Sequence, residues 1–113
     1  MTDLDSLSEL AKQFKTAYEN IRLAGKNLSD KTIEVMKAKT ALEISENSWL
    51  ANDKVEGKNA EIRKAVLAEL TTSERDYLNT KEIELQEAKQ QFAQAKSILD
   101  ELDVYLKIAE LEK

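Results

Sequence analysis

The fold is decided by residues 14–42, FKTAYENIRLAGKNLSDKTIEVMKAKTAL. Large apolar side chains recur at every seventh position of this stretch, and the spacing continues on both sides of it. The complete column consists of Leu7, Phe14, Ile21, Leu28, Val35, Leu42 and Trp49. A repeat of seven keeps one apolar residue on the same side of a helix every two turns, which is the pattern of a coiled coil. The column therefore predicts one long helix, from about residue 3 to about residue 54, that packs against another helix.

A second row, four residues after each member of the column, is expected to complete the apolar seam. It begins with Ala11, Tyr18 and Gly25 and then turns polar at Thr32, Lys39 and Glu46. Glycine inside a helix costs about 1 kcal/mol relative to alanine. The heptad phase nevertheless continues through Gly25, so we expect an unbroken helix there, with a kink as the alternative.

The segment Val55-Glu56-Gly57-Lys58-Asn59 predicts the corner between two helical arms. Gly57 suits the left-handed position that ends many helices. Asn59 is the expected N-cap of a short helix over residues 60–70. Thr71 and Glu74 are expected to form a capping box that starts a second long helix over residues 72–111.

The second long helix carries its own heptad column, Leu78, Leu85, Phe92, Leu99 and Leu106, beside the smaller row Ala88, Ala95, Leu102 and Ala109. The chain is therefore predicted to be a single helical domain, residues 1–113, of the all-α class. Its architecture is an antiparallel coiled-coil hairpin with a short connecting helix. Because two helices make a thin core, we expect the hairpin to dimerise into a helical bundle.

The two arms are expected to be unequal in length. If Thr72 pairs near Asp53, the first turns of the chain extend beyond the second arm and expose apolar side chains. The overhang carries Leu4, Leu7, Leu10 and Ala11. The candidates for self-association are Leu4, Leu7, Leu10 and Phe14.

Composition limits the function classes. Charged residues make up 35% of the chain and aromatic residues only 5%, with a net charge of −5, so duplex nucleic acid is a poor candidate ligand. The chain contains no His and no Cys, so it lacks the commonest general base, the commonest metal ligand and every thiol. We expect no enzyme activity, no cofactor, no membrane partner and a cytoplasmic location.

The corner supplies the candidate contact residues. Lys54, Lys58, Arg63 and Lys64 form a small basic cluster around Asn59, and an ordinary solvated tip is the alternative interpretation. Trp49 closes the first column beside the corner. It is either a core residue or an interface anchor, because tryptophan is frequent among binding hot spots.

The segment Glu56-Gly57-Lys58-Asn59-Ala60-Glu61-Ile62-Arg63-Lys64-Ala65 resembles the corner of small coiled-coil proteins from bacteriophages and prophages. The resemblance covers the corner and the helical layout, but not the details of the arms. It implies an accessory or host-takeover protein. If the corner is functional in such proteins, the corresponding residues here are Lys58, Asn59 and Arg63.

The sequence therefore favours a non-enzymatic protein–protein interaction module, which the resemblance extends to an inhibitor of a bacterial defence nuclease or CRISPR effector. One alternative is an accessory factor for phage recombination or replication that binds single-stranded nucleic acid. The other alternative is a structural coiled-coil spacer.

Overall fold

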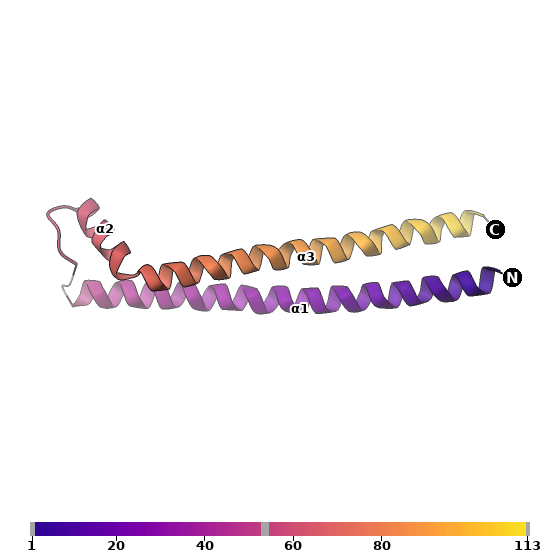
Figure 1. Ribbon diagram of the computed structural model, residues 1–113, viewed down its shortest axis with the longest axis horizontal. Coiled ribbons are helices and arrows are strands. Elements are labelled where there is room, and N and C mark those ends of the chain that lie inside the picture. The colour runs from indigo at the N-terminus through magenta and orange to yellow at the C-terminus, as the bar shows by residue number, and fades with distance from the viewer. Residues whose placement is uncertain (1, 53–54, 113) are drawn as a thin grey trace. The chain divides into compact units, whose positions relative to one another are not determined.

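The computed structural model of the protein describes residues 2–52 and 55–112. Within these residues the regular structure consists of three helices: α1 (Thr2–Ala51), α2 (Ala60–Leu70) and α3 (Thr72–Leu111) (Figure 1). The helices α1 and α3 pack against each other in antiparallel directions. The all-α hairpin with a short connecting helix is thus confirmed, and α1 continues through Gly25 as predicted.

Contacts divide the chain into two compact units. Unit 1 combines Met1–Ser29 with Glu87–Lys113, and unit 2 is Asp30–Gln86. Each unit contains a stretch of α1 and a stretch of α3, and unit 2 also contains α2.

The cores of the two units consist largely of small side chains. In unit 1 the buried residues are Ala17, Ala88, Ala95 and Leu102, and in unit 2 they are Val35, Ala38 and Thr71. Alanine lets two helix backbones approach closely, because little side-chain volume lies between them. Ala88, Ala95 and Leu102 belong to the row predicted beside the second column, so this part of the seam is confirmed.

The second row predicted for α1 is exposed at four of its six positions, and only Gly25 and Glu46 are half-buried. Tyr18 is 58% exposed, and Ala11, Thr32 and Lys39 are also exposed. The seam instead uses the row three residues after each column member: Leu10, Ala17, Ala24, Lys31, Ala38 and Ser45. Both rows lie next to the column on a helix with 3.6 residues per turn. The alanines on α3 decide between them, because they pack best against the small residues of the +3 row.

Contacts between the helices set the pairing register within each unit. In unit 1 a Cβ atom on Gly25 would lie 3.4 Å from the Phe92 ring. In unit 2 Ser45 Oγ donates a hydrogen bond of 3.2 Å to Glu74 Oε1. Counting back along both helices from Gly25 and Phe92 brings the last turn of α3 beside about residue 6 of α1. The N-terminal turns of α1 therefore have α3 beside them (Figure 1), and the predicted overhang is wrong.

The start of α2 is as predicted. Asn59 is its N-cap, and Asn59 Oδ1 accepts a 2.9 Å hydrogen bond from the Ile62 amide. Gly57 does not end α1, since that helix stops at Ala51. Gly57 has a φ of +158°, and a Cβ atom there would lie 2.7 Å from Ile62 Cγ2. Glycine is needed at this position for close approach to the first turn of α2.

The predicted capping box is also wrong. Thr71 is fully buried at the junction between α2 and α3. Its hydroxyl donates to the Leu67 carbonyl at 2.8 Å and accepts from Arg75 Nε at 2.9 Å. Glu74 is used instead in the bond to Ser45 across the hairpin. Local hydrogen bonds at the junction therefore use the Thr71 hydroxyl, and a contact across the hairpin uses Glu74.

Candidate functional site

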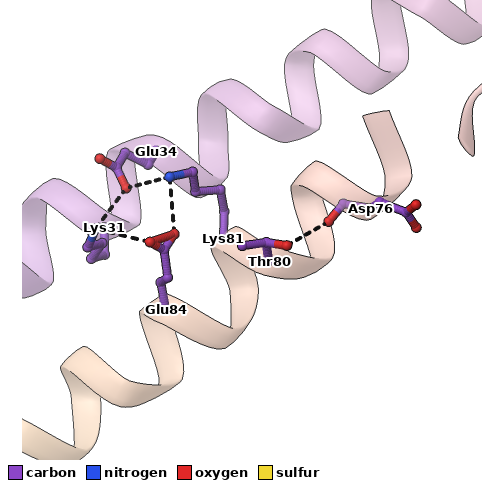
Figure 2. A network of polar contacts seen from close by, with 6 residues as sticks. All are labelled: Lys31, Glu34, Asp76, Thr80, Lys81 and Glu84. Carbon is purple, nitrogen blue, oxygen red and sulfur yellow. Dashed lines mark hydrogen bonds and ion pairs between the residues drawn. The ribbon is translucent and has the colours of Figure 1, made fainter. Parts of the chain in front are cut away.

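A layer of four charges interrupts the alanine row in unit 2 (Figure 2). Lys31 Nζ lies 3.3 Å from Glu34 Oε2 and 3.5 Å from Glu84 Oε1. Lys81 Nζ lies 3.1 Å from Glu84 Oε2 and 3.6 Å from Glu34 Oε2. Both Oε2 atoms are shielded from solvent. The i,i+3 spacing of Glu34 and Lys37 would suit an ion pair. The Glu34 carboxylate instead pairs with Lys31 and Lys81.

The layer shifts the ionisation of its own members. The Glu84 carboxylate beside Lys81 raises the pKa of that ammonium group. The Glu34 carboxylate likewise raises the pKa of Lys31, and the Lys81 ammonium lowers the pKa of Glu84. Every charge faces an opposite charge only in this register, so a slip along the seam would leave part of the layer unpaired. The layer is best understood as a device that fixes pairing.

A candidate binding surface lies in unit 1, between α1 and α3. Two adjoining grooves of about 340 and 230 Å³ share Ala17, Asn20 and Ile98. Their floor consists of side chains from the buried seam, Ala17, Ala24, Ala95 and Leu102. The small residues make the floor shallow enough for another helix to approach closely.

The walls of these grooves carry almost no charge. They are formed by Gln13, Thr16, Asn20, Gln91, Gln94 and Ile98, which we call the neutral face. The two charged lining residues, Glu9 and Lys12, lie toward the N-terminal end of α1. In a chain with 35% charged residues, this run of uncharged side chains is a candidate contact surface, because interface cores are depleted in charged residues.

The predicted corner residues lie in or next to unit 2, away from these grooves in the sequence. Lys58 and Asn59 lie in the segment before α2, and Arg63 and Lys64 lie in the first turns of α2; all four are exposed. The cations among them, Lys58, Arg63 and Lys64, make no ion pair with a described residue. Trp49 is half-buried in α1, and Lys54 lies outside the described residues.

The residues predicted for self-association have mixed surroundings. Leu10 and Phe14 are half-buried against the hairpin, whereas Leu7 is 47% exposed. Leu4 lies within α1, but its side chain is outside the described set. Their role in self-association stays a prediction, although the overhang that motivated it is absent.

Sequence reasoning missed a second apolar surface, on unit 2. Ile33, Met36 and Ile44 are 47%, 62% and 64% exposed on α1, where they line a shallow groove with Lys37, Thr40 and Ala41. Their spacing of three and then eight residues puts them on one side of a helix, which is a signal that the sequence carries. It was hidden because the stronger heptad column occupies the same segment.

Within residues 2–52 and 55–112, no group of three potential metal-ligating side chains comes together. No helix in this part of the chain is long and apolar enough to cross a membrane.

Comparison with protein families, with characterised proteins and with solved structures gives no match. The likeness of the corner to phage coiled-coil proteins therefore remains an interpretation of residues 56–65.

Proposed function

We propose that this protein acts by contact, as a helical interaction module whose neutral face binds a helix of another protein molecule. The observation that carries the proposal is the pair of grooves in unit 1, with an alanine-rich floor and walls that are uncharged apart from Glu9 and Lys12. A helix with an uncharged apolar face fits this surface. A nucleic acid does not, because the groove offers its phosphates no row of cations.

A second copy of the chain is the occupant that the chemistry of this face favours. An interface between identical copies must be self-complementary, so like charges across it are costly. The amide side chains of Gln13, Asn20 and Gln91 both donate and accept hydrogen bonds, and therefore can pair with their own kind. The hairpin also has need of a partner, since Val35 and Leu102 are the only buried apolar residues larger than alanine among those described.

Matched variants on α3 test this proposal. Ile98 is 44% exposed and lines both grooves, whereas Val104 is 54% exposed and lines neither. We expect the wild-type chain to sediment as a dimer, Ile98→Lys to sediment as a monomer with unchanged helix content, and Val104→Lys to remain dimeric. Equal behaviour of the two lysine variants, or a monomeric wild type, would refute the neutral face as a self-association surface.

A narrower proposal concerns the target of such a dimer. The resemblance to phage proteins and the net charge of −5 support an inhibitor that occupies the nucleic-acid channel of a bacterial defence nuclease or CRISPR effector. Saturating amounts of the protein should then suppress cleavage by one nuclease in a panel. Unchanged cleavage throughout the panel would count against this target class.

Two other functions are alternatives to the helix-binding module. The exposed cations Lys58, Arg63 and Lys64 support single-stranded nucleic-acid binding by the corner, for which loss of binding in a triple alanine variant is the test. A structural spacer would form tight oligomers and have no soluble partner.

A further inference from the structure

Unit 1 has a second surface, which differs from the neutral face in charge. On α1, Lys15, Tyr18, Arg22 and Lys26 follow one another at intervals of three and four residues, so they form one stripe along the helix. On α3, Lys89 and Lys96 lie two turns apart, about 10 Å along the helix. We call these six residues the basic face; all six are exposed.

Phe92 connects the two halves of the basic face. Lys96 Nζ lies 5.6 Å from the centroid of the Phe92 ring, and the same ring packs over Gly25. Gly25 is two helical turns from Tyr18 in the same stripe of α1. The Phe92 ring therefore places Lys96 of α3 on the side of the seam where Gly25 of α1 lies.

The charge of this surface is opposite to that of the chain. Residues 15–26 and 89–96 contain five cations and one carboxylate, Glu19, a local charge of +4 in a chain with a net charge of −5. Glu19 pairs with Arg22. The other four lysines make no ion pair with a described residue. Asp100 and Asp103 follow Lys96 on α3 and limit the basic face on that side.

Cations beside exposed aromatic rings are the combination that binds single-stranded nucleic acids. The cations neutralise backbone phosphates, and bases stack on the rings without a sequence preference. Tyr18 is 58% exposed, and its ring lies 6.3 Å from that of Phe14, which supports it from within the hairpin. An acidic protein segment could also use the cations, but it carries no regular series of bases to stack on the exposed ring.

We infer that the basic face of unit 1 binds single-stranded nucleic acid, through Lys15, Arg22, Lys89 and Lys96 on the phosphates and Tyr18 on a base. This site is separate from the corner cluster and from the neutral face. It uses no residue that lines the two grooves. An interaction module with this second site would hold a nucleic-acid strand and a helix at the same time.

The binding of a fluorescent oligothymidylate, followed by anisotropy, tests the inference. Neutralising four phosphates predicts a slope of about −3 in log affinity against log salt, or roughly a 60-fold loss between 50 and 200 mM salt. We expect the quadruple variant Lys15→Gln, Arg22→Gln, Lys89→Gln, Lys96→Gln to lose at least about 30-fold in affinity at low salt. Tyr18→Ala should lose about tenfold through stacking alone.

The matched control is a corner variant, Lys58→Gln, Arg63→Gln, Lys64→Gln, which removes three cations elsewhere. Binding that is lost in the corner variant but kept in the quadruple variant would overturn the inference. Equally strong binding of polyglutamate would also overturn it, because the basic face would then be a site for acidic protein segments. Helix content by circular dichroism verifies folding. Ile98→Lys should bind the oligonucleotide normally, so a failed dimerisation test and a failed nucleic-acid test are distinguishable.

Discussion

Truncation of Leu102 gives the most direct measure of what holds unit 1 together. Leu102 is 7% exposed and, among the described residues of this unit, is the only buried apolar side chain larger than alanine. Leucine to alanine removes about three carbon groups at about 0.8 kcal/mol each, so the transfer loss is about 2 kcal/mol. The cavity term should be small, because Leu102 borders a groove that is open to solvent.

A loss of about 2 kcal/mol should lower the Tm by about 8 °C, given an unfolding entropy of about 2.1 cal/mol/K for each residue. Thermal unfolding followed by circular dichroism at 222 nm measures the change at fixed protein concentration. Leu111→Ala is the matched control, since Leu111 is 86% exposed in the same helix, and it should cost less than about 0.5 kcal/mol. If Leu102→Ala and Leu111→Ala destabilise equally, Leu102 is not a core residue and the antiparallel seam of unit 1 is wrong.

Three further substitutions test local features. Gly25→Ala should raise the free energy of unfolding in urea by about 0.5–1 kcal/mol, because the new Cβ would lie at an ordinary 3.4 Å from Phe92. A lower free energy of unfolding would mean that the Phe92 ring cannot move aside. Asn59→Ala should cost about 1 kcal/mol and Asn59→Asp much less, measured by amide exchange in α2, and equal costs would exclude capping. Glu84 has a pKa lowered by Lys81, so its contribution is present above about pH 4.5 and is lost as the pH falls through the lowered pKa. Glu84→Gln should therefore show a smaller fall in Tm between pH 7 and pH 3 than the wild type. An equal fall in Tm would mean that the charged layer does not contribute to the pH dependence of stability.

The register shows why some sequence predictions fail. The heptad columns identify which residues of each helix are apolar, but any shift by one heptad keeps the columns in contact. Lys31 and Lys81 appear in the sequence as breaks in two alanine rows. Only when α1 and α3 pack together do these lysines meet Glu84 and Glu34. The lysine in each alanine row is therefore explained only by the ion pairs that it forms when the two helices pack.

The candidate surfaces show the same division. The lysines and arginines of the basic face are visible in the sequence, but they are separated by more than sixty residues until the hairpin forms. The neutral face likewise takes its walls from both arms. The corner and the overhang are features that a single helix can display, and the contact residues predicted from the sequence therefore lie there.

The sequence by itself determined the three helices, the two apolar columns, the cap at Asn59 and the antiparallel hairpin class. These follow from local periodicity and local hydrogen bonding, which neighbouring residues encode directly. Only the tertiary structure decided which second row of α1 is buried and which faces of unit 1 are neutral or basic. Both rows lie next to the column on an isolated helix, and the close packing of Ala17 and Ala24 with the alanines of α3 is what makes one of them the core.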